Sequence, residues 1–215
     1  EIGEVKASDA LERFDLVGIS SFTAQIDEAY ALADRYRSAG TPVVLGGLHV
    51  SLLPDEATAH ADAIVVNGAE GAWPELVEDF RRGQLKQRYD GARNKVFSDQ
   101  HYRMPRFDLL RGRPYNRLTV QTSRGCPLAC EFCAASMRIT DCFQQKSVEK
   151  SVTEIKAAMS VTDQPFFELA DDNTFVNKKW SKEFVRAIRP LGLRWFTESD
   201  ISLADDDELL RLLAE

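Results

Sequence analysis

The sequence predicts an α/β fold built from parallel strands, and three observations lead to this prediction. Short apolar runs recur along the chain, stretches with helical spacing of apolar residues separate them, and small or polar residues follow the runs. Continuous apolar strands separated by helices indicate a parallel sheet that helices cover on both faces. The pattern occurs in two parts of the chain, so we expect two such units.

The first unit is expected over residues 1–82. Its predicted strands are the apolar runs at residues 15–19, 42–45 and 63–66. Two helices are predicted from apolar residues that share one face, which are Ile26, Tyr30 and Ala33 in the first helix and Trp73, Leu76, Val77 and Phe80 in the second.

Small or polar residues follow each predicted strand of the first unit. They are Ser20 and Ser21, then Gly46 and Gly47, then Asn67, Gly68, Ala69 and Glu70. Ligands of doubly wound sheets bind beyond the carboxyl ends of the strands, where glycine lets a backbone approach closely. These strand ends are therefore a candidate cofactor site. The alternative is that the glycines only make tight turns between strand and helix.

Residues 83–117 break the pattern and carry nine Lys or Arg against three Asp, a local charge of nine minus three, or +6. We expect a basic interdomain linker here. The alternative is that some of its arginines line a crevice between two domains and bind a negative group of a cofactor or substrate. These arginines are Arg103, Arg106, Arg111, Arg113 and Arg117.

The second unit is expected over residues 118–215, with strands at 118–122, 166–169 and 194–197. Its first helix should follow Ser147 as N-cap, and a third helix should begin at Asp206. The apolar stripes are Val148, Val152, Ile155 and Met159 in the first helix, and Trp180, Phe184, Ala187 and Ile188 in the second, which should stop near Pro190.

Composition limits the partners and the compartment. The formal net charge of -7 argues against non-specific nucleic-acid binding, because that binding needs clustered Lys and Arg. No run approaches the ~20 apolar residues of a membrane span, and residues 1–10 lack the layout of a secretory signal. We therefore expect a cytoplasmic protein with no membrane span and no nucleic-acid partner.

Three of the four cysteines, Cys126, Cys130 and Cys133, form a C-x-x-x-C-x-x-C run. Thiols this close make a poor disulfide framework, whereas an iron–sulfur cluster that leaves one iron open needs three thiolates close together, which cysteines on a single loop suit well. The alternative is a structural zinc site, whose fourth ligand could only be Cys142 or a distant histidine. We expect Cys142 to be an ordinary buried thiol.

The loop that contains these cysteines reads SRGCPLACEFC and resembles the radical S-adenosylmethionine superfamily, including the aromatic Phe132 before the last cysteine. The resemblance implies a 4Fe-4S cluster on Cys126, Cys130 and Cys133, with S-adenosylmethionine on the open iron. One electron would then release a 5′-deoxyadenosyl radical, and the protein would orient the reactants and exclude water. Phe132 would pack near the adenine.

In similar enzymes a Gly-Gly-Glu triplet after the second barrel strand faces the methionine amine. This chain has Ala-Asp-Asp-Asn there, so the resemblance implies that Asp171 or Asp172 makes the contact. The alternative is that both residues cap the turn before the next helix. Candidates for the ribose hydroxyls follow the third strand and are Glu198, Ser199 and Asp200.

The first unit resembles the cobalamin-binding domain that often precedes a radical S-adenosylmethionine barrel, through residues 17–21, 44–49 and 67–71 in the family's order. The resemblance implies that cobalamin lies against Ser20, Ser21, Gly46, Gly47, Gly68 and Glu70. No D-x-H-x-x-G motif is present, so we expect no histidine on cobalt and interpret His49 as a turn residue. The family's first strand, helix and second strand are expected to be missing before Glu1.

The implied fold is a Rossmann-like, cobalamin-binding-type parallel sheet followed by the first half of a radical S-adenosylmethionine partial (β/α) barrel. The function implied is cobalamin-dependent methyl transfer to an unactivated carbon of a small molecule, with electrons from a donor such as flavodoxin or ferredoxin. The alternatives are a radical oxidoreductase or cyclase whose cobalamin-like domain is only a scaffold, and a non-catalytic metal-binding module. A methylthiotransferase would need three more cysteines before residue 118, and none is present there.

Three βα units follow the linker, fewer than such a barrel has. We therefore expect the chain to be a fragment that cannot turn over alone, and we expect its last helix to expose an apolar face made by Leu209, Leu210, Leu212 and Leu213.

Overall fold

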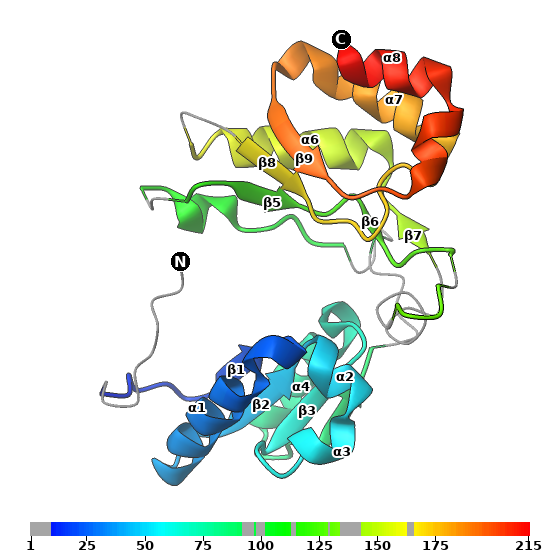
Figure 1. Ribbon diagram of the computed structural model, residues 1–215. Helices are drawn as coiled ribbons and strands as arrows, with labels where there is room; N and C mark the ends of the chain where they lie inside the picture. The colour runs from blue at the N-terminus through cyan, green and yellow to red at the C-terminus, as the bar shows by residue number, and fades with distance from the viewer. Residues whose placement is uncertain are drawn as a thin grey trace. The chain divides into compact units, whose positions relative to one another are not determined.

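The structure is a computed structural model that describes residues 10–91, 97, 102–112, 115–128, 130–133, 143–162 and 166–215. The chain folds as two compact units, which Figure 1 shows. The first contains the described residues up to 97, and the second contains the described residues from 102 onward. None of the described helices has both the length and the apolar character that a membrane crossing requires.

The first unit is a parallel sheet flanked by helices. Its strands are β1 (Val17–Ser20), β2 (Val43–Gly46), β3 (Ala63–Val66) and β4 (Arg88–Asp90). They pair in parallel in the order β1-β2-β3-β4. The helices are α1 (Ile26–Ser38), α2 (Leu48–Leu52), α3 (Pro54–Ala57) and α4 (Ala69–Arg81), and a 3-10 turn, η1 (Thr23–Gln25), precedes α1.

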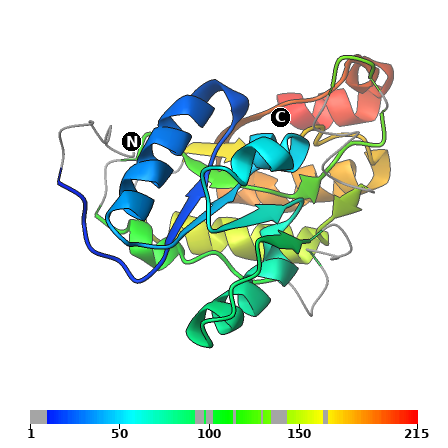
Figure 2. The same ribbon diagram turned by 90° about the horizontal axis from the view of Figure 1, so that it is seen from below.

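Helices cover both faces of this sheet, as Figure 2 shows. Successive residues of a strand point to opposite faces, so Val43 and Leu45 pack with α1, α2 and α3, while Val44 packs with α4. Two apolar cores result, and the continuous apolar strands of the sequence follow from burial on both sides.

The segment that we expect to be a linker contributes to both units. Residues 88–90 form β4 at the edge of the first sheet. A 3-10 turn, η2 (Phe107–Leu110), places Phe107 in the apolar core of the second unit. The charge pattern did not reveal these contributions, because β4 alternates exposed and buried residues and has only Tyr89 facing the core.

The second unit contains a parallel sheet in the order β5-β8-β9 and a short antiparallel pair, β6 with β7. The strands are β5 (Leu118–Val120), β6 (Ser123–Arg124), β7 (Gln144–Gln145), β8 (Phe166–Leu169) and β9 (Arg194–Thr197). The helices are α6 (Val148–Met159), α7 (Lys178–Ile188) and α8 (Asp207–Ala214), with 3-10 turns η3 (Arg189–Leu191) and η4 (Ile201–Asp205).

Helices α6 and α7 pack on one face of the β5-β8-β9 sheet, around Phe167 and Phe184, which are fully buried. The predicted N-cap of α6 is confirmed, because the Ser147 hydroxyl accepts a hydrogen bond from the Lys150 amide at 3.2 Å. Strands followed by helices on one face are the repeating unit of a (β/α) barrel. The predicted fold class is confirmed in both units.

Part of the apolar face of α8, which we expected to be exposed, is buried within the second unit. Leu209 is fully buried and packs with Phe175 and Val185, whereas Leu210 is 39% exposed. The last helix therefore packs within the second unit through one stripe of its leucines.

Candidate functional site

The first candidate site is a cavity of about 260 Å³ at the carboxyl ends of β1, β2 and β3. Its lining residues are Gly18, Ile19, Ser20, Val44, Gly46, Gly47, Val65, Asn67, Ala69 and Trp73. Three of the residues predicted for cobalamin, Ser20, Gly46 and Gly47, therefore lie together at one hollow. Among the other three, Gly68 is the N-cap of α4, Glu70 lies in its first turn, and Ser21 is buried beside β2.

Gly47 holds the ends of β1 and β2 close together. Its φ of 99° lies in the left-handed region, and a Cβ there would be 2.6 Å from the Ser21 carbonyl oxygen. The Ser51 hydroxyl donates to the Gly47 carbonyl at 2.9 Å and accepts from the Asn67 amide at 2.9 Å. One hydroxyl thus connects the ends of β2 and β3, and the cavity floor is held by backbone contacts.

Trp73 is a site residue that the sequence did not reveal. We assigned it to the apolar face of a helix, but it is 40% exposed and lines the cavity. A Cβ on Gly18 would be 3.2 Å from the indole Cη2 atom, so the missing side chain of Gly18 makes room for the ring. A glycine inside an apolar strand was the available signal, because it often marks a close approach by another group.

His49 is not a turn residue, and that interpretation was wrong. It lies in α2, which begins directly after Gly47, and it is only 5% exposed. Its Nδ1 lies 3.1 Å from the Thr23 hydroxyl and its Nε2 lies 3.2 Å from a Glu56 carboxylate oxygen. The hydrogen bond from His49 holds the pKa of Glu56 below its usual range. Both ring nitrogens of His49 therefore have hydrogen-bond partners within the first unit.

The second candidate site is the cysteine loop after β5 and β6. Cys126, Cys130 and Cys133 are half-buried and form no disulfide, and the Cys133 amide donates to the Cys130 carbonyl at 3.0 Å. In the part of the chain that the structure describes, no group of three His, Cys, Asp or Glu side chains is arranged to hold a metal ion. Cys142 lies outside the described residues.

Asp171 ties the start of this loop to β8. It is 4% exposed, and one carboxylate oxygen accepts from the backbone amides of Thr122 and Ser123 at 2.7 and 2.8 Å. The other accepts from the hydroxyls of Thr122 and Thr174. Burial raises the pKa of Asp171, while these hydrogen bonds act in the opposite direction. A carboxylate with four donors from its own chain has little capacity left for a ligand amine.

Asp172 is exposed and more accessible than Asp171. One of its oxygens accepts from the Gly125 amide at 3.1 Å, and Gly125 has a φ of 77° directly before Cys126. The second oxygen of Asp172 could face a ligand amine. Phe132, Glu198 and Ser199 are also exposed, Phe132 by 92%.

Asn173 is a buried polar residue at this edge that was not among the predicted site residues. It is 2% exposed, and its Nδ2 lies 3.9 Å from the Cys126 sulfur and 2.5 Å from the Asp200 carboxylate. Hydrogen bonds from Ser202 and Asn173 lower the pKa of Asp200 to about 2. Asn173 follows two aspartates, whose carboxylates are the more obvious partners of a ligand amine, and nothing in the sequence distinguishes its amide from an ordinary polar group.

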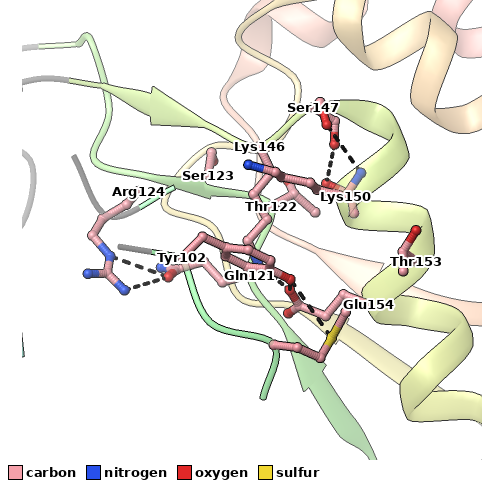
Figure 3. A network of polar contacts seen from close by, with 12 residues as sticks. Tyr102, Gln121, Thr122, Ser123, Arg124, Lys146, Ser147, Lys150, Thr153 and Glu154 are labelled. Atoms are coloured by element: carbon pink, nitrogen blue, oxygen red, sulfur yellow. Dashed lines mark hydrogen bonds and ion pairs between the residues drawn. The ribbon is translucent and has the colours of Figure 1, made fainter. Parts of the chain in front are cut away.

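A buried ion pair supports the loop from the side of α6, as Figure 3 shows. Lys146 and Glu154 are 4% and 2% exposed and lie 2.5 Å apart. The Tyr102 hydroxyl donates to the same Glu154 oxygen at 2.7 Å, and the Lys146 amide donates to the Thr122 carbonyl at 2.8 Å. Burial and Glu154 raise the pKa of Tyr102, so its hydroxyl remains a donor. The pair therefore fixes the end of β7 against Thr122, which also donates hydrogen bonds to Asp171.

Three of the arginines named for the basic segment, Arg103, Arg106 and Arg117, contact groups of the second unit. Arg117 pairs with Glu168 at 2.7 Å and Arg106 pairs with Asp108 at 2.7 Å. Arg103 donates to the Tyr102 carbonyl at 2.9 Å. Arg111 is exposed, and Arg113 lies outside the described residues.

The chemistry of the side chains at both sites fits the groups that the resemblance implies, although the described cysteines are not arranged around a metal ion. Three half-buried thiols on one loop, with an amide N–H directed at one sulfur, suit thiolate ligation of an iron–sulfur cluster. A hollow with glycine and serine walls and one indole side suits a ligand with flat apolar and polar parts.

Known proteins resemble the chain along most of its length. Residues 5–77 match the B12 binding domain family. Bacteriochlorophyllide d C-8(2)-methyltransferase of Chlorobaculum tepidum is 32% identical over 221 residues, which cover 94% of this chain and 48% of that protein. Bacteriochlorophyllide d C-12(1)-methyltransferase of the same organism is 26% identical and covers 93% of the chain and 45% of that protein. The chain thus spans about half the length of these relatives.

A solved structure has the same fold. The cobalamin-dependent S-adenosylmethionine radical enzyme OxsB, solved with aqua-cobalamin and S-adenosylmethionine bound, superposes with a TM-score of 0.71 at 16% identity. The match covers 92% of this chain and 33% of that structure.

Proposed function

Because the chain belongs to the family of radical S-adenosylmethionine enzymes with a cobalamin-binding domain, we propose that the whole protein is a methyltransferase acting on an unactivated carbon of a small molecule. The observation that carries the proposal is the loop of three half-buried thiols that Asp171 and Asp172 tie to the end of β8. The methyltransferase relatives support the reaction class.

In this proposal Cys126, Cys130 and Cys133 hold a 4Fe-4S cluster, and S-adenosylmethionine binds beside it. A bound cluster would supply one-electron reduction of S-adenosylmethionine, with the electron from a donor such as flavodoxin or ferredoxin; this would break the bond between sulfur and C5′ and give methionine and the 5′-deoxyadenosyl radical. The free oxygen of Asp172 would accept a hydrogen bond from the methionine amine, and the exposed ring of Phe132 would cover the adenine.

The residues behind the loop would have a positioning role. Asp171 fixes the Thr122 and Ser123 amides, and the Lys146–Glu154 pair fixes the strand beside them, so the first cysteine follows a rigid segment. Glu198 and Ser199, exposed at the end of β9, are the proposed partners of the ribose hydroxyls.

Iron analysis of the whole protein tests the cluster. After anaerobic reconstitution we expect about four irons per chain and broad absorption near ~400 nm, as thiolate-bound clusters give. Changing any one of Cys126, Cys130 and Cys133 to Ala should abolish the absorption, whereas Cys142→Ala should preserve it. A colourless protein that binds zinc would contradict the proposal and favour a metal-binding module. Methylated product from labelled S-adenosylmethionine would separate methyl transfer from oxidoreductase or cyclase chemistry.

We further propose that the cavity of the first unit holds part of a cobalamin, which would supply the methyl group, with no histidine of the described residues on cobalt. Ala69 is exposed and lines the cavity, so Ala69→Trp should fill the hollow without disturbing a core. We expect binding of cobalamin to weaken at least about tenfold, because the bulky ring competes for the same volume.

The matched control is Ala39→Trp, at an alanine that is also exposed but lies outside the cavity, and this variant should bind cobalamin as the parent does. Equal affinity in both variants would place cobalamin elsewhere. Spectra with nitrogen ligation that disappears in His49→Ala would show that a histidine binds cobalt after all.

A further inference from the structure

Asn173 lies behind the cysteine loop and is directed at one sulfur. It follows β8, is 2% exposed, and places its Nδ2 atom 3.9 Å from the Sγ of Cys126. A hydrogen bond to sulfur is longer than one to oxygen, so this separation is a direct N–H···S contact. Among the described residues, it is the side-chain amide that contacts a predicted cluster ligand.

The orientation of this amide is fixed by its other partners. Nδ2 donates to a carboxylate oxygen of Asp200 at 2.5 Å, and Oδ1 accepts from the Asp200 backbone amide and the Ser199 hydroxyl, each at 3.5 Å. A flipped amide would place its carbonyl oxygen against the Asp200 carboxylate. The two hydrogens on Nδ2 are therefore divided between Asp200 and the Cys126 sulfur.

We propose that Asn173 is a positioning residue that donates a hydrogen bond to the Cys126 sulfur and thereby raises the reduction potential of the cluster held there. The inference rests on the proposed function, because it requires Cys126 to be a cluster ligand. Hydrogen bonds to ligand sulfurs stabilise the negative charge that a cluster gains on reduction, so they favour the reduced state. The acceptor carboxylate of Asp200 keeps the amide in the orientation that this role needs.

The test is a redox titration of the whole protein, reconstituted anaerobically and measured by electron paramagnetic resonance without S-adenosylmethionine. Asn173→Leu keeps the approximate volume of the side chain and removes both N–H groups. We expect the equilibrium constant for one-electron reduction to fall about threefold to tenfold, with a more negative midpoint potential. A tenfold change corresponds to about 59 mV for a one-electron couple.

The matched control is Asn177→Leu, which makes the same change four residues later. Asn177 caps α7 and donates to Gln145, so its loss should weaken the helix and leave the potential unchanged. Asn173→Ala is a second variant, which removes the same N–H groups with a smaller side chain. It should shift the potential in the same direction as Asn173→Leu.

The outcomes separate the inference from the proposed function. A parent protein without iron would overturn the proposed function, and the inference with it. A parent with a full cluster and an unshifted potential in Asn173→Leu would overturn the inference alone. If Asn173→Leu does not fold, an unshifted potential in Asn173→Ala would have the same meaning. Equal shifts in Asn173→Leu and Asn177→Leu would show a general effect of the end of β8 rather than a hydrogen bond to sulfur.

Discussion

The two units differ in how the carboxyl edge of the parallel sheet is built. In the first unit the edge is a hollow lined by Gly18, Gly46 and Gly47, whose missing side chains let neighbouring groups approach closely. In the second unit the edge is filled by buried polar side chains, of which Asp171 and Asn173 are 4% and 2% exposed. The edge of the first unit leaves an open cavity, whereas the edge of the second unit holds the cysteine loop in place.

This difference determines which substitutions each unit tolerates. At the glycine edge, backbone segments lie in close contact, so a substitution that adds a side chain should destabilise it. Glycine has no side chain to truncate, so only added atoms can test this edge. The polar edge is held by acceptors for buried donors, so lost acceptors should damage it, because an unsatisfied buried N–H carries its full desolvation cost. Stability measurements on the two units can test each half of this contrast.

The largest effect is expected at Asp171. Asp171→Ala would leave two buried amides and two hydroxyls without their acceptor and should destabilise the second unit by about 3–5 kcal/mol. Amide hydrogen exchange at Thr122 and Ser123 should become faster, and the second unit should unfold at a lower urea concentration. Asp172→Ala removes one hydrogen bond at an exposed position and should cost about 1 kcal/mol or less. Similar losses in both variants would show that burial of Asp171 is not what holds the loop.

A smaller effect is expected at Gly47 in the first unit. Gly47→Ala combines a positive φ with a Cβ 2.6 Å from the Ser21 carbonyl oxygen, so we expect about 2–4 kcal/mol of destabilisation. Gly40 is the control, because its φ of 81° is also positive but a Cβ there would meet nothing within 4 Å. Gly40→Ala should cost only about 1 kcal/mol, from conformational strain alone. Equal costs in urea unfolding would remove the close approach at Gly47 from the explanation.

The sequence predicted the elements of regular structure well because their signals are local. Apolar runs marked β2, β3 and β8, and a polar residue before an apolar stripe marked the start of α6 at Ser147. The strand at residues 88–90 was missed because a short edge strand with one buried residue has almost no apolar period. Its pairing depends on contacts with β3, which are distant in sequence.

The candidate sites were predicted less completely, because a side chain's role depends on what it faces. The sequence brought Ser20, Gly46 and Gly47 to one edge, and the structure places all three at one cavity. It could not distinguish Asp171 from Asp172, because they are neighbours whose side chains point in different directions, one into the unit and one toward solvent. Asn173 was not among the predicted site residues for the same reason.

The smallest predicted effect is a change in the pH dependence of the second unit, and it probes the polar edge through Asp200. Hydrogen bonds from Ser202 and Asn173 lower its pKa to about 2, below the value of about 3.9 for an unfolded aspartate. A lowered pKa in the folded state gives stability that is present above about pH 4 and is lost as the pH falls through about 2. Solvent screening limits this contribution to less than about 1 kcal/mol.

Asp200→Asn should therefore unfold with a flatter dependence on pH than the parent between about pH 4 and 2, measured by urea unfolding at each pH. Asp206 and Glu208 also have lowered pKa values, and burial raises that of Asp171, but these groups are common to both proteins and cancel in the difference. If the two profiles remain parallel, the carboxylate of Asp200 contributes nothing to the folded edge. The orientation of the Asn173 amide would then depend on packing rather than on charge.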